Sequence, residues 1–276
     1  MQQQAYKNIV AAALAEDVGF GDRTTASIFT VQKGEGLIVT REAGVVAGLQ
    51  VAAEVFAQVN PGVHFQTELA DGDSIKPGDK LAFLAGPLAG ILTGERVALN
   101  FLQRLSGIAT ATRDAVERVA GSGAMITDTR KTTPGLRVLE KYAVRAGGGE
   151  NHRFNLFDMV LIKDNHIRGA GSISAAVRRV KQRCGFTVKI EVEAGTLEEV
   201  QEALQCGVDV IMLDNMCTEE MSAAVRLINK KALVEASGGI TREKLAEVAS
   251  AGVDLISLGY LTYAAGALDF ALEIMP

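Results

Sequence analysis

The stretch from Thr187 to Asp214, TVKIEVEAGTLEEVQEALQCGVDVIMLD, has the pattern of a strand, a helix and a second strand. Residues 187–193 alternate between charged and apolar side chains, which indicates a β-strand with two different faces. Residues 196–205 are typical of a helix, and residues 209–214 are a short apolar run. Together these segments predict a β-α-β unit with parallel strands.

The same alternation extends in both directions from this unit. Further strands are predicted at 124–127, 158–163, 232–237 and 254–259, with further helices at 136–145, 172–183, 219–230 and 242–251. Alternating strands and helices indicate a parallel sheet with right-handed crossovers. The six units fill only residues 124–259, whereas a complete eight-fold barrel typically takes ~250 residues. We therefore expect either an open α/β barrel or a doubly wound sheet.

The chain outside this repeat has a different pattern. Helices are predicted at 4–16 and 49–59, and short strands and hairpin turns at 36–42, 45–48, 62–69 and 71–86. A long helix is predicted from residue 87 to 121, with Leu92, Ala98, Leu99, Leu102 and Leu105 on its apolar face. Gly107 is expected to kink or divide this helix and to mark the passage to a second domain.

A last helix is predicted around residues 263–274, packing back on the first domain or closing the barrel. We expect one domain over residues 1–107 plus this C-terminal helix, at about 263–276. The second domain is expected over residues 108–262.

Positive charge is concentrated in one segment of an acidic chain. The sequence has 28 Lys and Arg against 33 Asp and Glu, yet residues 126–167 are basic and contain two of the three histidines. The cations of this segment are Arg130, Lys131, Arg137, Lys141, Arg145, Arg153 and Lys163. A local positive cluster in an acidic protein indicates a site for a small anion, whereas a nucleic-acid surface usually gives a basic domain.

Composition also limits the cellular setting. The N-terminal residues have no signal-peptide pattern, and no run approaches the ~18 apolar residues of a membrane-spanning helix. Cys184, Cys206 and Cys217 have no C-x-x-C spacing, so reduced thiols are expected. We expect a cytoplasmic protein that acts on small molecules, with neither a membrane nor a nucleic acid as partner.

Every predicted strand of the repeat ends in charged residues or glycine. In parallel α/β folds the reactive groups lie at these carboxyl ends. The strand-end residues are Asp128, Arg130, Lys131, Lys163, Asp164, Asn165, Glu191, Glu193, Asp214, Asn215, Ser237, Gly238, Gly239 and Gly259. In the third strand, a period of two places Lys189, Glu191 and Glu193 on the face toward the barrel interior. Either a Lys–Glu pair fills space there, or the carboxylates face a metal-bound or hydroxyl-rich substrate.

Two local motifs suggest ligand contacts. Ser237-Gly238-Gly239 precedes a predicted helix, so its N–H groups could cradle a phosphate, although the same residues suit an ordinary turn. His152 lies beside Arg153 and shortly after a triple glycine, which favours a role in anion binding. A metal site built on His152 and His166 is not favoured, because no Cys or third His joins them at ligand spacing.

Several segments resemble the quinolinate phosphoribosyltransferase family, in family order over nearly the whole chain. They are GDRTT (21–25), ERVALNFLQRLSGIAT (95–110), DTRKTTPGLRVLEKYAV (128–144), GGGENHRFNLFDMVLIKDNHI (147–167), EVE (191–193), IMLDN (211–215) and EASGGI (235–240). The resemblance implies an N-terminal α/β sandwich domain and an open, six- to seven-stranded parallel α/β barrel. It also implies a homodimer, or a hexamer built as a trimer of dimers, with active sites shared between subunits.

The reaction implied by the resemblance joins quinolinate to 5-phosphoribosyl 1-diphosphate with Mg²⁺ and gives nicotinate mononucleotide, CO₂ and diphosphate. Arg130, His152, Arg153 and Lys163 match the dicarboxylate-binding positions of the family. Arg96 matches an arginine that reaches in from the neighbouring subunit.

The remaining implied roles concern the second substrate. Lys131 and Lys163 match the lysines near the diphosphate and the substrate, and Glu193 and Asp214 match the carboxylates at the ribose hydroxyls and Mg²⁺. These four are the predicted catalytic residues, with Glu193 and Asp214 also the predicted metal contacts, through the Mg²⁺–substrate complex. The predicted substrate-binding set is completed by Thr129, Ser237, Gly238, Gly239 and Gly259.

Three other functions are compatible with parts of the sequence. A sister family associated with molybdenum transport shares the fold but lacks the triplet Asn151-His152-Arg153. A Schiff-base lyase could use Lys163 at a strand end, but it leaves the arginines without a role. A non-catalytic anion-binding module is the third. The loop GYLTYAAG (259–266) departs from the family pattern near Tyr263 and Ala264, which leaves the phosphate contacts there open.

Overall fold

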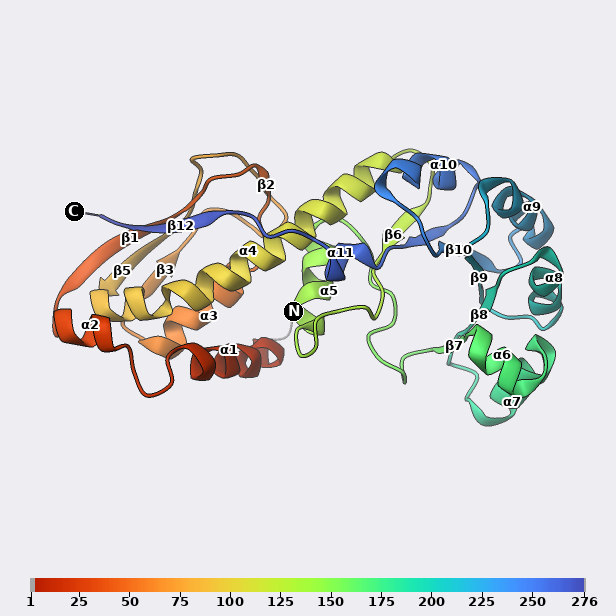
Figure 1. The fold of residues 1–276 in the computed structure, drawn as a ribbon, viewed down its shortest axis with the longest axis horizontal. Helices are drawn as coiled ribbons and strands as arrows, with labels where there is room; N and C mark the ends of the chain where they lie inside the picture. Colours follow the sequence, from red (N-terminus) through yellow and green to blue (C-terminus); the bar gives the residue numbers. More distant parts are fainter. Residues whose placement is uncertain (1–2, 276) are drawn as a thin grey trace. The chain divides into compact units, whose positions relative to one another are not determined.

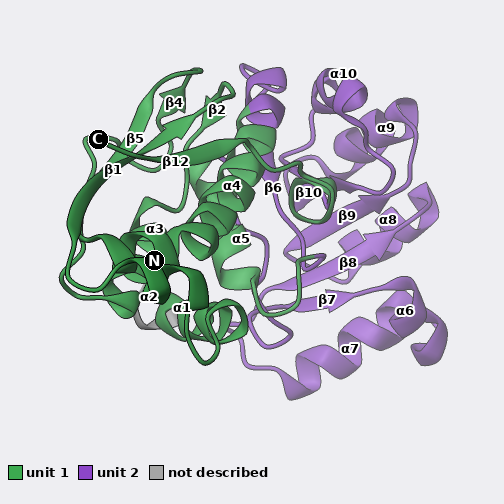
Figure 2. Cartoon of the chain, turned by 60° about the vertical axis from the view of Figure 1, so that its left-hand side comes forward, with its two compact units in different colours: residues 1–113, 132–148, 260–276 green, residues 114–131, 149–259 purple. Residues whose placement is uncertain are grey.

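The computed structural model describes residues 3–275, and the chain divides into two compact units (Figure 2). Unit 1 comprises residues 1–113, 132–148 and 260–276, and unit 2 comprises residues 114–131 and 149–259. The division falls within the long helix α4 (Leu88–Arg118). Residues 132–148, which follow the first strand of the repeat, cluster with unit 1.

Unit 1 contains a four-stranded antiparallel sheet in the order β12-β1-β5-β3. Its strands are β1 (Lys33–Thr40), β3 (His64–Gln66), β5 (Lys80–Pro87) and β12 (Phe270–Ile274). A separate pair is formed by β2 (Gly44–Val45) and β4 (Ser74–Ile75). The helices are α1 (Gln3–Asp17), α2 (Arg23–Ile28), α3 (Leu49–Val59), most of α4, α5 (Arg137–Ala146) and α11 (Tyr260–Tyr263). Phe56 of α3 is fully buried and stacks on Phe65 of β3, which fixes the helix to the sheet.

The helix predicted at residues 263–274 is wrong. The chain forms the short helix α11 and then β12, which pairs with β1 from Gly36↔Ile274 to Thr40↔Phe270. Ala, Leu and Glu in this segment favour a helix locally. The edge of β1, however, offers a row of backbone N–H and C=O groups, and this long-range pairing overrides local propensity.

Helix α4 continues without interruption through Gly107, so Gly107 does not divide it as predicted. The apolar face is largely as predicted, since Ala98, Leu99, Leu102 and Leu105 are buried. A Cβ at Gly107 would overlap the carbonyl oxygen of Gly266 and lie 2.9 Å from its carbonyl carbon. The glycine therefore lets the backbone of the C-terminal segment cross directly over the helix.

Unit 2 is a six-stranded parallel sheet in the order β6-β11-β10-β9-β8-β7. The strands are β6 (Met125–Thr127), β7 (Val160–Ile162), β8 (Ile190–Ala194), β9 (Val210–Asp214), β10 (Leu233–Ser237) and β11 (Leu255–Ser257). The helices are α6 (Asp164–Ala170), α7 (Ile173–Arg183), α8 (Leu197–Gln205), α9 (Thr218–Ile228), the 3₁₀ turn η1 (Arg242–Lys244) and α10 (Leu245–Ser250). Figure 1 shows these helices along the outer side of the curved row of strands.

The sheet does not close, because its two outer strands, β6 and β7, do not pair with each other. Thr127 of β6 forms an isolated bridge to Glu150 rather than to a residue of β7. The predicted open parallel α/β barrel is therefore confirmed, with six strands. The predicted position of Lys189 inside the barrel is wrong. Strand β8 begins at Ile190, so Lys189 precedes it and is exposed, while Glu191 is fully buried. Among the helices of residues 3–275, none combines the length and the apolar character needed to cross a bilayer.

Candidate active site

A cavity of about 560 Å³ lies in unit 2 and is lined by residues at the carboxyl ends of its strands. Every residue of the predicted site other than Arg96 and Gly259 lines it, as do Leu161, Met212, Asn215, Glu235 and Ser257. This volume is in the range of small-molecule sites. Arg96 is an exposed residue of α4 in unit 1, and Gly259 follows β11.

Strand register explains why these side chains meet. Glu193 of β8 is in register with Met212 of β9, which is in register with Glu235 of β10. Asp214 is likewise in register with Ser237. Residues in register on neighbouring strands point to the same face of a sheet. All five line the cavity, so this face is the inside of the open barrel.

One wall of the cavity is cationic. Arg130 and Arg153 are partly buried, and the Arg153 guanidinium donates to the carbonyl oxygen of Met159 at 3.2 Å. Burial lowers the pKa of Arg153, and the positive charge of Arg130 lowers it further, against a smaller opposing effect of Glu191. A guanidinium nevertheless stays charged at neutral pH. Two like charges crowded into one cavity favour an anion bound between them.

Lys163 is placed by the end of β7 and by His166. The backbone N–H of Lys163 donates to His166 Nδ1 at 2.9 Å, in the first turn of α6. The Lys163 ammonium forms a short ion pair with Glu193 Oε1, while Glu193 Oε2 accepts from the N–H of Asp164 at 3.3 Å. His166 therefore orients this loop and is exposed, rather than acting as a metal ligand with His152.

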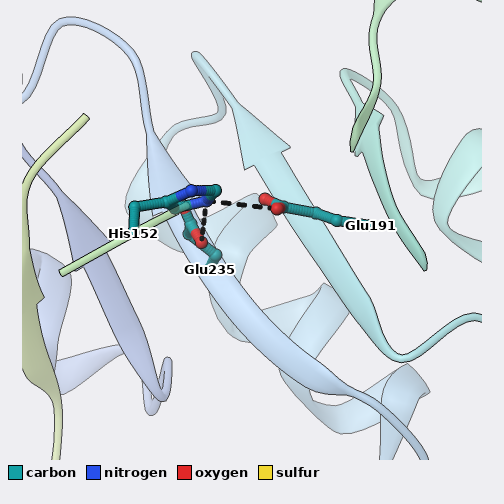
Figure 3. A group of neighbouring side chains, drawn as sticks. All are labelled: His152, Glu191 and Glu235. Atoms are coloured by element: carbon teal, nitrogen blue, oxygen red, sulfur yellow. Dashed lines mark ion pairs between the residues drawn. The ribbon is translucent and has the colours of Figure 1, made fainter. Parts of the chain in front are cut away.

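His152 faces two buried carboxylates from different strands (Figure 3). Its Nε2 is 3.1 Å from Glu191 Oε2 and 3.4 Å from Glu235 Oε2, and the two glutamates are 0% and 1% exposed. Burial lowers the pKa of His152, whereas its contacts with both glutamates and their charges raise it, so the ring keeps a proton on Nε2, the nitrogen that faces them. Burial raises the pKa of Glu191.

The second ring nitrogen has its own partner. The backbone N–H of Arg153 donates to His152 Nδ1 at 2.8 Å. That bond requires a lone pair on Nδ1 and so opposes a second proton on the ring. The geometry therefore describes the tautomer that carries its proton on Nε2, facing the carboxylates.

Asp128 fixes the backbone that carries His152. This carboxylate is fully buried at the end of β6, and it accepts from the His152 N–H at 2.9 Å and from Asn151 Nδ2 at 2.6 Å. The following residues are held by Asp158, which accepts from the N–H groups of Phe154 and Asn155 at 2.6 and 3.1 Å. After the bridge between Glu150 and Thr127, the irregular segment 151–155 is thus ordered largely by carboxylates.

Another part of the cavity lining is built from backbone as much as from side chains. Gly238 and Gly239 have φ values of +88° and +61°, which side chains of L-residues rarely adopt. A Cβ at Gly238 would lie 2.5 Å from Oδ1 of Asn215, so the amide of Asn215 occupies that space. Residues 242–244 form a 3₁₀ turn after these glycines, where the sequence predicted an α-helix. This part of the lining combines bare backbone with the carboxylate of Asp214.

The sequence reasoning missed four residues that shape the site, namely Asp128, Glu191, Asn215 and Glu235. Asp128 and Asn215 are predicted only as strand-end residues, and Glu191 is predicted to face the barrel interior but not to contact His152. Glu235 was not considered, although it is the only charged residue of the apolar run ALVEAS. A buried charge in such a run needs a partner, and this could have indicated that it faces another buried group.

Comparisons with known proteins agree along the whole chain. The family model for the N-terminal domain of quinolinate phosphoribosyl transferase matches residues 22–106, and that for its C-terminal domain matches residues 108–273. A probable nicotinate-nucleotide pyrophosphorylase (carboxylating) of Bacillus subtilis (strain 168) is 46% identical over 274 residues, which cover 99% of this chain and 95% of the relative. The protein of the same description from Synechocystis sp. is 47% identical over 265 residues, covering 95% and 90%. The crystal structure of NadC from Streptococcus pyogenes is similar with a TM-score of 0.96 and 41% identity, covering 100% of this chain and 99% of that one.

Proposed function

The chain belongs to the quinolinate phosphoribosyltransferase family, and from this we propose that its unit 2 cavity binds quinolinate and 5-phosphoribosyl 1-diphosphate together. The protein is a pentosyltransferase of NAD biosynthesis. It transfers the phosphoribosyl group to quinolinate with decarboxylation, giving nicotinate mononucleotide, CO₂ and diphosphate. The observation that carries the assignment of the site is one cavity with arginines on one wall and carboxylates on another.

Quinolinate fits the cationic wall. Its two neighbouring carboxylates need forked donors and point charges, which Arg130, Arg153 and Lys163 supply. His152 lines the same cavity. We assign these four residues to the dicarboxylate, as the family resemblance implies.

The phosphoribosyl substrate fits the carboxylates and glycines that line the same cavity. Glu193 and Asp214 can accept from ribose hydroxyls, and the N–H groups of Gly238 and Gly239 suit a phosphate. Lys131, the last residue of the segment 114–131 of unit 2, is assigned to the diphosphate. Thr129 and Ser237 also line the cavity and complete the polar surface, and Gly259 is assigned to a phosphate.

The donor set also fits Mg²⁺. Carboxylate oxygens and substrate phosphates are the ligands that Mg²⁺ prefers, and Glu193 and Asp214 line the same cavity. We propose that these two carboxylates hold Mg²⁺ through the bound substrate. The ion, when bound, supplies positive charge that stabilises the leaving diphosphate.

The chemistry requires orientation and charge rather than a protein nucleophile. The pyridine nitrogen uses its lone pair to bond the anomeric carbon, while the bond from that carbon to the diphosphate breaks and the diphosphate keeps the electron pair. The ring nitrogen is then cationic. The bond to the adjacent carboxylate breaks, CO₂ leaves, and the electron pair remains on the ring carbon beside the cation until a proton is taken up. Arg130 and Arg153 orient the ring for the first step.

The direct test is a product assay with purified protein. With quinolinate, 5-phosphoribosyl 1-diphosphate and Mg²⁺ we expect CO₂ and nicotinate mononucleotide in equal amounts. Nicotinate is the control substrate, because it lacks the carboxylate that quinolinate loses as CO₂. The arginines then have only one of their two carboxylates to bind. Formation of nicotinate mononucleotide from nicotinate, with quinolinate inert, would contradict the assignment.

Lys163 bears on the lyase alternative. A Schiff base needs a neutral amine, and the Glu193 carboxylate faces the ammonium of Lys163 directly. The geometry therefore favours Lys163 as a charged contact.

We further propose a cytoplasmic setting, in keeping with two multiply charged metabolites as substrates.

We propose a homodimer in which Arg96 of one subunit completes the site of the other, with a trimer of such dimers as a further possibility for assembly. Arg96 is exposed on α4. Next to Arg153, unit 2 exposes Leu156 and Phe157, whose exposed fractions are 70% and 82%. Exposed apolar side chains beside a substrate cavity are stabilised when a second subunit covers them.

Hybrid dimers test the sharing of the site. Arg96→Ala and Arg153→Ala should each be poorly active alone, because each removes a contact from every site. Refolding or co-expressing the two variants should restore about a quarter of the wild-type activity, since half the dimers are mixed and each carries one intact site. Activity of the mixture that stays at the mean of the two variants would show that Arg96 acts within its own subunit or not at all.

A further inference from the structure

Three buried carboxylates surround the segment Asn151–Arg153 without being assigned a contact with either substrate. Asp128, Glu191 and Glu235 come from β6 or its end, β8 and β10, and they are at most 1% exposed. Burying a carboxylate costs several kcal/mol unless it is paired. Such groups beneath a cavity that binds a dianion are not explained by substrate binding, because their charge would repel it.

The contacts of His152 suggest what these carboxylates do. Its backbone N–H is held by Asp128, its Nε2 by Glu191 and Glu235, and its Nδ1 by the N–H of Arg153. The ring is therefore fixed to the protein through both of its nitrogens. Because its Nε2 faces the two glutamates, His152 would meet quinolinate, to which it is assigned, through its carbon edge or its ring face.

A structural cation is the other occupant that this cluster could take. One ligand atom from each of His152, Glu191 and Glu235 lies within 4.8 Å of the others. However, Nε2 is already at hydrogen-bonding distance from both carboxylates. A proton shared along these contacts satisfies the same atoms as a metal ion would.

We propose that Glu191 and Glu235 are positioning residues, which hold His152 in one tautomer and through it place Arg153 for binding quinolinate. The four residues assigned to quinolinate, Arg130, His152, Arg153 and Lys163, are called the quinolinate clamp below. The inference rests on the proposed function, because the clamp is the assumed binding site of quinolinate. The hydrogen bond from the Arg153 N–H to Nδ1 exists only while the ring proton stays on Nε2. Loss of the carboxylate acceptors frees the ring to rotate or change tautomer, and the segment bearing Arg153 then loses one of its anchors.

The experiment compares two replacements of similar shape at each glutamate. Glu191→Met and Glu235→Met remove the acceptor, whereas Glu191→Gln and Glu235→Gln keep an acceptor oxygen. We expect each Met variant to raise the KM for quinolinate about tenfold or more, with the KM for 5-phosphoribosyl 1-diphosphate within about twofold, because a small displacement of a binding group has large effects. The Gln variants should retain most of the quinolinate affinity. Glu198→Gln, on the exposed surface of α8, is the control for the change of charge.

A readout independent of activity is the ¹⁵N spectrum of the imidazoles, which is simple because the chain has three histidines. In the wild-type protein His152 should show a protonated Nε2 and an acceptor Nδ1. The Met variants should lose this signature and show exchange between tautomers, with circular dichroism and thermal melting establishing that they are folded.

The outcomes separate this inference from the function itself. Folded Met variants with wild-type quinolinate kinetics, or a wild-type His152 protonated on Nδ1, would overturn the inference while the enzyme remained active. A metal ion bound stoichiometrically at His152 in the isolated protein would overturn it as well. Absence of product from the wild-type protein would instead reject the proposed function and leave the tautomer result standing.

Discussion

The Arg130→Ala and Arg153→Ala variants are each expected to raise the KM for quinolinate by about tenfold to more than a hundredfold. Each replacement removes a charge-assisted contact with a carboxylate, worth about 1.5–3 kcal/mol. Both arginines line the cavity, and Arg153 is partly buried, so water replaces the lost contact poorly. The KM for 5-phosphoribosyl 1-diphosphate should change much less, because that substrate is assigned to the carboxylates and glycines of the cavity.

Steady-state kinetics with each substrate varied in turn provide the measurement. Arg179→Ala is the matched control, since Arg179 is an exposed arginine of α7 in the same unit and does not line the cavity. Arg130→Lys separates charge from shape, because lysine keeps the charge but cannot form a forked contact. Unchanged quinolinate kinetics in both alanine variants would exclude these positions from the clamp.

The Gly107→Ala variant is expected to lose more than about 3 kcal/mol of unfolding free energy, through overpacking against backbone. The added Cβ would overlap the carbonyl oxygen of Gly266 and lie 3.1 Å from the Cα of Ala267. Neither of these atoms belongs to a flexible side chain, so the C-terminal segment or α4 must move. Since domains are stable by about 5–15 kcal/mol, this change would unfold a large part of the protein at elevated temperature.

Urea denaturation followed by circular dichroism measures this effect. Gly169→Ala is the control, because Gly169 is exposed in α6 and no atom lies within 4 Å of the position of its Cβ. That variant should be neutral or slightly stabilised, as alanine is favoured over glycine in a helix by about 1 kcal/mol. Equal midpoints for the two variants would mean that the C-terminal segment yields to the added methyl group.

The parallel repeat could be predicted because its signals are local. Strands β6 to β11 are short apolar runs at regular spacing, and in the helices between them apolar residues recur at helical spacing among polar ones. The end of the chain could not be predicted in the same way. Residues 270–274 form a strand only because β1, more than two hundred residues earlier, offers an edge, and no periodicity within the segment indicates that partner.

Gly107 illustrates a second limit of the sequence. A glycine in a helix indicates weakness when only the helix is considered, and so a kink was predicted. Its actual role depends on the backbone at Gly266, which approaches from a distant part of the chain. The same limit applies to Gly238, which the sequence predicts as a phosphate contact or a turn residue, whereas its lack of a side chain also accommodates Asn215.

The charged residues that line the cavity could be predicted from the sequence, whereas the contacts of the buried glutamates could not. Arginines, lysines and strand-end carboxylates are visible in the sequence, and most of them line one cavity. Glu191 and Glu235 differ because their importance comes from facing His152 across the barrel interior. Only the register of β8, β9 and β10 brings them together, and that register is a property of the whole sheet.

The pairing of β1 with β12 has a consequence for synthesis of the chain. Residues 36–40 are made more than two hundred residues before their partners at 270–274. Unit 2 falls mostly in one continuous span between them, residues 149–259, and can complete its sheet before residues 270–274 are made. Until residues 270–274 emerge from the ribosome, the edge of β1 remains open to strands of other nascent chains. Translation that stops short of residue 270 would therefore release a chain in which unit 2 can fold but the edge of β1 stays unpaired and prone to aggregation.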